Sequence, residues 1–268
     1  MASKPKADFG RFAILEPDDH YNIIASSEGP AGSGKSHWWL TAPDPLAYFL
    51  FEPGGLKGLR SNPLFRDRFD SGGIRVIDFS KELNFGKMAK EDRVLRALEV
   101  MEQFQEDWDS AIGWARTIVW DKEEYVWEMI RYAHDEVDSP TPKNFHELNL
   151  MMHGWVSDAE KHTINFGLLR GIEDTWGKIG VSQSTGKAQM GFTGVMRPRG
   201  HKKVPDLVQI NLSHTWNEAE REFEITILDK CRLGNAVSLM GKTFGAMDFP
   251  MLAQLLYPES EATDWGLE

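Results

Sequence analysis

Residues 21–36 read Tyr-Asn-Ile-Ile-Ala-Ser-Ser-Glu-Gly-Pro-Ala-Gly-Ser-Gly-Lys-Ser. The apolar run at 21–25 predicts a β-strand, and residues 29–36 match the pattern G-x-x-x-x-G-K-[ST] at every position. A strand that leads through such a loop into a helix is typical of a phosphate-binding loop. The stretch therefore predicts an α/β fold in which this loop binds a nucleoside triphosphate.

The residue types in this loop suit phosphate binding for separate physical reasons. Gly29, Gly32 and Gly34 lack a Cβ atom, so the backbone can curl and direct successive N–H groups at the β-phosphate. The helix that follows adds the positive end of its dipole. We expect Lys35 to reach the β- and γ-phosphates and the Ser36 hydroxyl to take one position on Mg²⁺. The expected nucleotide contacts are Gly29, Pro30, Ala31, Gly32, Ser33, Gly34, Lys35, Ser36 and His37.

Composition limits the class of protein and its surroundings. The chain has 268 residues, 41% of them hydrophobic, which suits one large α/β domain with a sizeable core. Its net charge of −11 means that the surface as a whole does not attract nucleic acid, so any such contact needs a local basic patch. The single cysteine, Cys231, excludes an internal disulfide. With no apolar run of membrane-span length and no signal peptide, we expect a cytoplasmic protein without a membrane partner.

Two predicted strands deliver acidic residues to their carboxyl ends. The apolar run 46–51 predicts a central parallel strand and ends at Glu52, while residues 116–121 have the same form and end at Asp121. Ligands of open α/β sheets bind at the carboxyl ends of the strands. We therefore expect Glu52 to orient the water that attacks the γ-phosphate and Asp121 to hold Mg²⁺, through a water molecule. A solvated strand-end carboxylate is the alternative for Glu52.

The rest of the chain continues the alternation of helices and strands. An apolar pattern of helical period over 88–115 predicts a crossover helix that covers the sheet. The strand predicted over 162–170 ends at Arg170, where the guanidinium either contacts the γ-phosphate or is simply solvated. The other predicted elements are helices at 35–41, 123–136, 144–160 and 247–256 and strands at 73–78, 208–212 and 223–227.

Residues 177–203 reverse the sign of the chain's charge. They hold six Lys or Arg residues and six glycines, with no Asp or Glu. Such a stretch cannot bury itself, so we expect a mobile loop. An aromatic residue among cations suits single-stranded nucleic acid, because the charges follow the backbone while the ring stacks on bases; a solvated surface loop is the alternative. The expected DNA contacts are Lys178, Lys187, Phe192, Arg197, Arg199, Lys202 and Lys203.

Two further cations follow the predicted strand at 223–227. Lys230 and Arg232 are spaced so that, in an extended chain, their side chains project to the same side. From there they could meet a phosphate that the subunit's own loop does not hold.

The order of these parts resembles the RecA-like ATPase core, and most closely the small phage-encoded ATPases of single-strand annealing and recombination. The resemblance covers residues 13–257 and rests on the loop at 29–36, on Glu52, on Asp121 and on Asp-Lys-Cys-Arg-Leu-Gly at 229–234. It implies a mostly parallel central sheet flanked by helices, with antiparallel strands on its C-terminal side. It also implies ATP and Mg²⁺ as cofactors and an oligomer, either a ring or a filament.

The same resemblance implies roles for the cations. Lys230 and Arg232 become fingers that stabilise charge on the ATP of the adjacent subunit, and residues 177–203 take the place of the second DNA-binding loop of recombinases. Where recombinases carry a glutamine sensor, this chain has Arg170. That difference leaves open how the ATP site and the DNA loop are coupled.

The resemblance thus implies a Mg²⁺-dependent ATPase that binds single-stranded DNA and promotes annealing or strand exchange in phage recombination. It would act in the host cytoplasm, with a single-strand binding protein as a further candidate partner. A helicase or helicase-loading motor, and a nucleotide-gated DNA-binding module with little turnover, are the alternatives. We expect a flexible arm at 1–12, the ATPase domain at 13–257 and a disordered acidic tail at 258–268.

Overall fold

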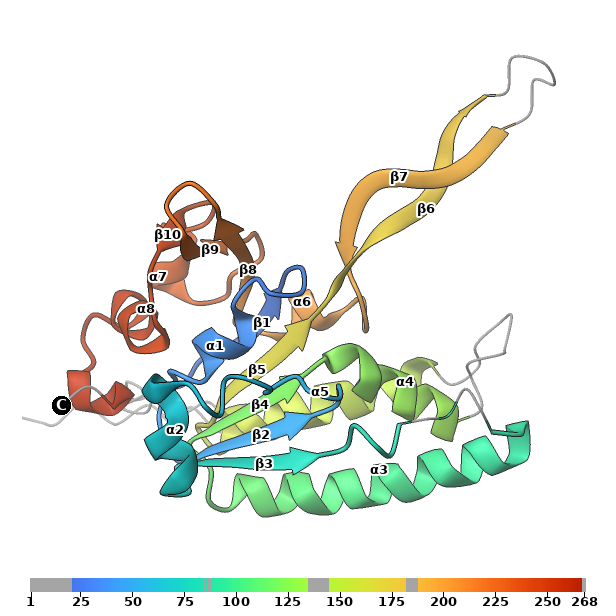
Figure 1. The fold of residues 1–268 in the computed structure, drawn as a ribbon, viewed down its shortest axis with the longest axis horizontal. Coiled ribbons are helices and arrows are strands. Elements are labelled where there is room, and N and C mark those ends of the chain that lie inside the picture. The colour runs from blue at the N-terminus through green and yellow to red at the C-terminus, as the bar shows by residue number, and fades with distance from the viewer. Residues whose placement is uncertain (1–20, 84, 86–87, 135–144, 182–187, 267–268) are drawn as a thin grey trace, which may run out of the picture.

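Short apolar runs form the parallel strands at the centre of the molecule (Figure 1). The computed structural model describes residues 21–266, apart from 84, 86–87, 135–144 and 182–187. Every residue of the three strands β2, β4 and β5 is buried, as expected for parallel strands covered on both faces. In spatial order the five strands are β1 (Ile24–Glu28), β5 (Asn165–Arg170), β4 (Thr117–Asp121), β2 (Leu46–Leu50) and β3 (Ile74–Asp78).

The C-terminal part of the chain extends this sheet on the other side of β1. Strand β8 (Ile210–Asn217) is parallel to β1, whereas β9 (Glu222–Ile227) is antiparallel to β8 and β10 (Thr243–Gly245) is antiparallel to β9. The complete order is β10-β9-β8-β1-β5-β4-β2-β3. The predicted fold class, a mostly parallel sheet with helices around it and antiparallel strands on the C-terminal side, is confirmed.

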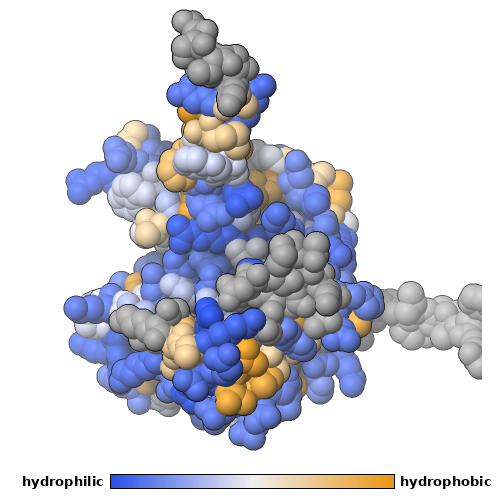
Figure 2. All heavy atoms as spheres, turned by 90° about the vertical axis from the view of Figure 1, so that its right-hand side faces the viewer, coloured by the Kyte–Doolittle hydropathy of each residue, from blue (hydrophilic) through white to orange (hydrophobic). Residues whose placement is uncertain are grey.

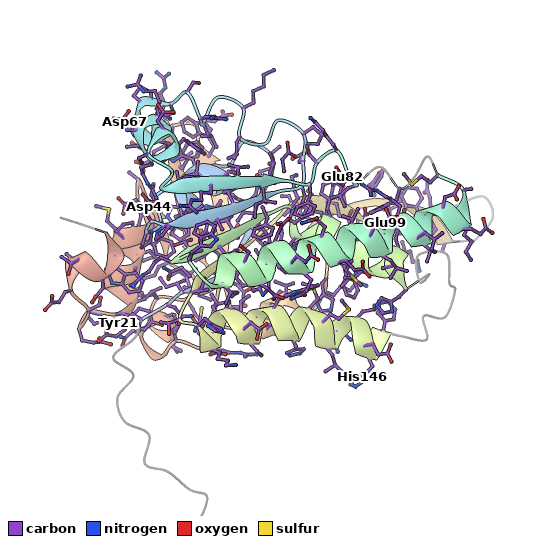
Figure 3. All side chains as sticks on the ribbon, turned by 90° about the horizontal axis from the view of Figure 1, so that it is seen from below. Tyr21, Asp44, Asp67, Glu82, Glu99 and His146 are labelled. Carbon is purple, nitrogen blue, oxygen red and sulfur yellow. The ribbon has the colours of Figure 1, made fainter. Side chains whose placement is uncertain are left out.

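Helices cover both faces of the sheet and enclose two apolar clusters. One face carries α3 (Lys90–Ile112), α4 (Glu123–Ala133) and α5 (Phe145–Lys161), and Figure 3 shows α3 and α5 side by side beneath the strands. The other face carries α1 (Lys35–Trp39), α2 (Pro63–Asp70) and α8 (Phe249–Leu256). The shorter helices α6 (Val204–Leu207) and α7 (Gly234–Val237) complete the two layers. Among the described helices, none is both long and apolar enough to cross a membrane.

The predicted helices and strands of the core agree with the structure to within a few residues, and α2 is the longest helix that we did not predict. It has a clear start signal, since the Asn62 side chain accepts a hydrogen bond from the backbone N–H of Leu64 and proline follows at the first helical position. Only Phe65 of this helix is buried. With so few buried positions, the helix shows little apolar period in the sequence.

The predicted mobile loop at 177–203 is wrong for the described part of that segment. Most of it forms a long antiparallel hairpin of β6 (Ile172–Val181) and β7 (Ala188–Pro198), which projects from the body (Figures 1 and 2). The two strands satisfy each other's backbone hydrogen bonds, which the expected loop would have left to water. The glycine and charge content of the segment does not reveal this pairing. Lys187 lies outside the described residues, as do the predicted arm at 1–12 and the remaining residues up to 20.

The prediction of a disordered acidic tail is also wrong for its described residues. Residues Ala262–Trp265 form the 3-10 helix η2, with a capping box between Glu261 and Asp264. The Trp265 side chain is fully buried, and its ring stacks on that of Tyr257 with centroids 5.8 Å apart. One tryptophan therefore anchors a segment whose acidic composition predicted no structure.

We predict that Trp265→Ala destabilises the protein by about 3 kcal/mol, because it removes a fully buried indole and leaves a cavity. Equilibrium unfolding in denaturant measures this loss. Trp176→Ala is the matched control, since the side chain of Trp176 is 62% exposed. Equal stability of Trp265→Ala and wild type would contradict the docked tail.

Candidate nucleotide-binding site

The loop between β1 and α1 has a backbone that only glycine accommodates at two positions. Gly34 has a φ of 88°, in the left-handed region, and a Cβ atom there would lie 2.6 Å from a ring carbon of Phe223. A Cβ atom at Gly29 would collide with the backbone oxygen of His214. The curled loop predicted from the motif is therefore fixed by its neighbours on β8 and β9.

Lys35 lies within this curl. Its Nζ donates to the carbonyl oxygens of Gly29 and Pro30, both at 2.8 Å, and to Ser33 Oγ at 3.3 Å. Burial lowers the pKa of Lys35 to about 8, and the positive charge of Lys122 acts in the same direction. A bound polyphosphate would supply the negative charge that favours the protonated amine. The loop thus holds the Lys35 ammonium at the place where we expect the β- and γ-phosphates to bind.

Ser36 and Asp121 come together, although they are 85 residues apart in the chain. Ser36 Oγ lies 3.3 Å from Asp121 Oδ2, because α1 begins above the carboxyl ends of β1 and β4. The pKa of Asp121 is raised because the carboxyl group is buried, and the hydrogen bond from Tyr48 opposes this shift only in part. A hydroxyl and a carboxylate are hard oxygen ligands of the kind that Mg²⁺ prefers. The pair fits the predicted metal, and its binding there stays a prediction.

Tyr48 is a site residue that the sequence analysis missed. It lies on β2, and its hydroxyl donates to Asp121 Oδ2 at 2.7 Å, where Asp121 also meets Ser36. Its side chain is fully buried. A phenol inside an otherwise apolar strand needs a hydrogen-bond partner, and this was the available signal. Tyr48 holds one carboxylate oxygen of Asp121 and so orients the other.

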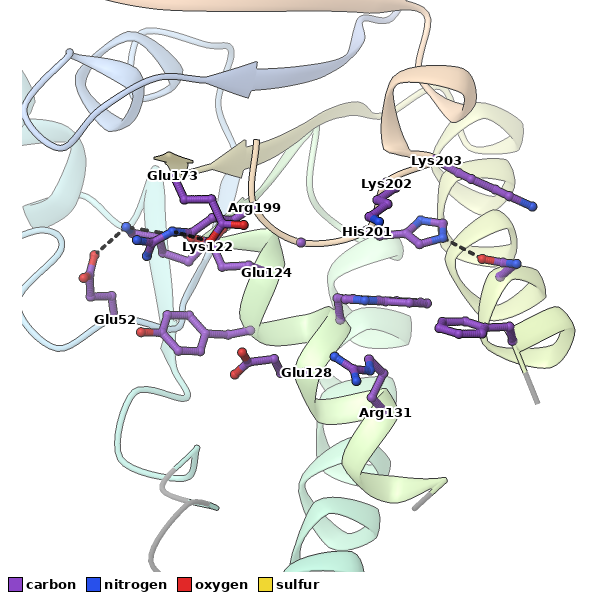
Figure 4. A pocket seen from close by; sticks show the side chains of 15 residues that line it. Glu52, Lys122, Glu124, Glu128, Arg131, Glu173, Arg199, His201, Lys202 and Lys203 are labelled. Carbon is purple, nitrogen blue, oxygen red and sulfur yellow. Dashed lines mark hydrogen bonds and ion pairs between the residues drawn. The ribbon is translucent and has the colours of Figure 1, made fainter. Parts of the chain in front are cut away.

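Glu52 reaches the site from the end of β2 but forms an ion pair there. Lys122 Nζ lies 3.3 Å from Glu52 Oε2 and 4.0 Å from Glu124 Oε1 (Figure 4). Lys122 directly follows Asp121, has a φ of 79° and is only 18% exposed in its side chain. A non-glycine residue in this conformation is uncommon and indicates a constrained position. The sequence analysis placed Glu52 at this edge but missed the lysine that binds it.

Arg170 is neither solvated nor exposed for contact with a bound γ-phosphate. The guanidinium is buried and donates to the backbone oxygens of Arg199, at 2.7 and 3.0 Å, and of His201, at 3.1 Å. Its Nε lies 3.3 Å from Glu123 Oε2, an ion-pair distance without good hydrogen-bond geometry. Arg170 therefore holds the chain that leaves β7 against the start of α4. Its buried partners occupy the group that we expected to face the nucleotide.

Glu123 completes this connection. It is fully buried, and its Oε1 accepts a hydrogen bond from the backbone N–H of His201 at 3.1 Å. Burial raises the pKa of Glu123 to about 7, against the opposing effect of the Arg170 charge. Glu123 follows Asp121, the last residue of β4, by two positions. Its carboxylate therefore connects the end of β4 to the foot of the hairpin.

A cavity of about 790 Å³ lies between α4, α5 and the foot of the hairpin (Figure 4). On one side the His201 ring lies 4.3 Å from that of Trp127, and His201 Nε2 lies 2.6 Å from Asn149 Oδ1. Burial lowers the pKa of His201 to about 4, so the ring is neutral near pH 7. Three of the predicted DNA contacts lie around this cavity: Arg199, Lys202 and Lys203.

The other residues that we predicted to contact DNA, as far as the structure describes them, lie on the hairpin. The side chain of Phe192 is 67% exposed, and its ring packs edge-on against Trp176 with centroids 5.1 Å apart. Lys178 is nearby on β6. Arg197 pairs with Glu173 at 3.0 Å, and Arg199 lies 3.6 Å from the same carboxylate. Glu173 precedes the predicted basic segment, so part of the positive charge is neutralised by a residue that the sequence interpretation did not include.

The two predicted fingers lie in the turn after β9. The backbone N–H of Arg232 donates to Gln209, whose own N–H donates to Ile24 at the start of β1. Arg232 is exposed and lies near the amino ends of β1 and β8. The phosphate-binding loop emerges from the opposite, carboxyl end of β1. Lys230 is also exposed and lies 2.7 Å from Asp206. Neither residue is brought to the subunit's own loop, and a role at a neighbour's site stays a prediction.

The chain was compared with protein families, curated proteins and solved structures, and only the last comparison found similar proteins. No protein-family model matches the chain, and no curated protein matches it. Among solved structures it is similar to the crystal structure of the RadB recombinase, with a TM-score of 0.46 and 13% identity. The match covers 83% of this chain and 86% of that one. The functional assignment rests on the geometry of this chain's own residues.

We predict that Tyr48→Phe weakens the effect of Mg²⁺ on nucleotide binding about 10-fold, because a partner that orients a metal ligand is lost. Calorimetric titration with ADP, with Mg²⁺ and with a chelator, measures that effect. Affinity for metal-free ADP should not change. Tyr132→Phe, on the part of α4 that packs against Phe85, is the control. An unaltered effect of Mg²⁺ in Tyr48→Phe would contradict the role.

Proposed function

We propose that the chain is an oligomeric, Mg²⁺-dependent ATPase that binds single-stranded DNA and promotes annealing or strand exchange in phage recombination. The observation that carries the catalytic part is the convergence of three side chains at one edge of the sheet. Lys35 lies inside the curled loop, and Ser36 lies 3.3 Å from Asp121. This is the set that a Mg²⁺-nucleoside triphosphate needs.

In the proposed reaction each residue has a distinct task. The loop N–H groups and Lys35 bind the phosphates, and Ser36 and Asp121 hold Mg²⁺. The metal ion, when bound, neutralises charge that develops on the γ-phosphoryl group. Glu52 orients the attacking water and accepts its proton, for which its carboxylate must be released from Lys122. Hydrolysis therefore requires a rearrangement at the end of β2.

The hairpin supports the DNA part of the proposal. Trp176 and Phe192 are 62% and 67% exposed on a two-stranded element that has no covering layer. Exposed aromatic side chains of this kind indicate a binding surface, and rings beside cations are suited to stacked bases and phosphates. Lys178 and Arg197 on the hairpin, with Lys202 and Lys203 at its foot, supply the cations.

The oligomeric part rests on the placement of Lys230 and Arg232. Both residues are exposed in the turn that follows β9. Arg232 lies near the amino ends of the parallel strands, away from the subunit's own phosphate-binding loop at their carboxyl ends. In a ring or filament the amino ends would meet the phosphate-binding end of the adjacent subunit, where the two cations would stabilise the transferred phosphoryl group.

One observation favours a second candidate, a nucleotide-gated DNA-binding module with little turnover. The Glu52 carboxylate is paired with Lys122, so the proposed water-orienting group is engaged in this structure. Lys122 also reaches Glu124, and the start of the hairpin at Gly171 is adjacent to both side chains. If DNA on the hairpin did not release Glu52, the chain would bind ATP and hydrolyse it slowly.

We predict that Lys122→Met raises the DNA-independent hydrolysis rate several-fold, because it frees the Glu52 carboxylate from its ion pair with the Lys122 ammonium. Release of phosphate at saturating ATP measures this rate. Lys122→Arg keeps the positive charge and is the control. In the double variant Glu52→Gln/Lys122→Met the gain should disappear. A rate for Lys122→Met at or below that of wild type would contradict the inhibitory pairing.

The test of the whole proposal is ATP hydrolysis with and without single-stranded DNA. We expect stimulation in wild type, no hydrolysis in Lys35→Ala, and loss of stimulation in a variant with Lys178, Arg197, Lys202 and Lys203 changed to Gln. That variant should also bind DNA more weakly and with a smaller salt dependence, because fewer counterions are released. The control changes Lys57, Lys81, Lys161 and Lys242, exposed elsewhere, to Gln. An unchanged rate with DNA and normal DNA binding by the hairpin variant would refute the DNA assignment.

A further inference from the structure

Three aromatic side chains border the phosphate-binding loop on the side away from Asp121. Trp216 and Phe223 pack edge-on with ring centroids 4.8 Å apart, and His37 lies 5.8 Å from Phe223. Phe223 also closes against Gly34 of the loop, where no Cβ atom would fit. We call Trp216, Phe223 and His37 the aromatic platform. Phe223 helps to fix the shape of the loop, but no role in phosphate or metal binding accounts for the exposed ring of Trp216.

Trp216 is the exposed member of this platform. On β8 the side chains of Leu212, His214 and Trp216 alternate onto the face that carries α1, and His214 packs on Trp38 at 5.6 Å. Leu212 and His214 are buried, whereas Trp216 lies two residues farther toward the loop side and is 45% exposed. Its ring is thus exposed next to Phe223, which lies on the neighbouring strand and packs against Gly34 of the loop.

The loop gives a bound nucleotide a direction. Successive residues of α1 turn by about 100°, so Ser36 faces Asp121 while Gly34 and His37 face Phe223. The γ-phosphate belongs beside the metal pair and Glu52. The nucleoside must then leave the loop on the opposite side, which is the side of the aromatic platform.

We propose that the aromatic platform binds the nucleobase by stacking and makes the site prefer purines while discriminating little between adenine and guanine. This deepens the proposed function and rests on it. Purines offer the larger π-face, and stacking does not read the hydrogen-bonding edge of a base. The side-chain amide next to Trp216 in the sequence, that of Asn217, is already engaged: Nδ2 donates to Glu224 on β9 at 2.6 Å, and Oδ1 accepts from the backbone N–H of Ala219.

The test compares nucleotides with a ligand that has no base. In wild type, calorimetry with Mg²⁺ should show ADP and GDP binding with similar affinity, and CDP and UDP binding several-fold more weakly. Trp216→Ala should lose about 10-fold in ADP affinity together with the purine preference, while its affinity for inorganic tripolyphosphate stays that of wild type. Trp216→Phe should recover most of the loss. Leu64→Ala, which removes an exposed apolar side chain from α2, should bind every ligand as wild type does.

Each result separates this inference from the proposed function. Wild-type ADP affinity in Trp216→Ala, or an equal loss for ADP and tripolyphosphate, would overturn the stacking role and leave the phosphate site intact. The absence of any preference for purines in wild type would also overturn it. If wild type bound neither ADP nor tripolyphosphate, the proposed function itself would fail, and this inference with it.

Discussion

The carboxylate of Asp121 is the point on which the nucleotide site depends. It is buried at the end of β4, where an ionised group is costly unless hydrogen-bond donors surround it. Tyr48 donates from β2, and Ser36 lies within reach from α1. These contacts require β2 and β4 to pair in their observed register and α1 to begin directly above the strand ends. The placement of the proposed metal ligands, and with it the direction that we propose for a bound nucleotide, depends on this junction.

The residues that follow Asp121 extend the junction toward the hairpin. Lys122 pairs with Glu52, and Glu123 contacts both Arg170 and the backbone of His201 at the foot of β7. Three successive residues thus have three roles: Asp121 is the proposed metal ligand, Lys122 pairs with the proposed water-orienting carboxylate, and Glu123 supports the foot of the proposed DNA-binding arm. The three sites are therefore joined by direct contacts within one short segment of the chain. Arg170 takes part in these contacts from inside the protein, where the sequence suggested a contact with the nucleotide.

Sequence reasoning succeeded where the signal is local. The motif at 29–36, the apolar runs of β2 and β4 and the period of α3 each state their structure within a short window. It failed where local composition gave the opposite impression. The glycine-rich basic stretch pairs with itself as β6 and β7, and the acidic tail docks through the buried ring of Trp265. Backbone pairing and a single anchoring side chain both outweigh average composition, and neither is visible in it.

The sequence by itself determined the nucleotide-binding loop, the α/β class and the strand ends that carry Glu52 and Asp121. These depend on glycine at special backbone angles and on apolar strands buried on both faces, which are properties of adjacent residues. Only the tertiary structure decided that Tyr48 supports Asp121, that Lys122 engages Glu52, and that Trp216 stands beside the loop. Such contacts join residues from different strands and helices. Their distances are set by sheet order and packing, which no short stretch of the chain encodes.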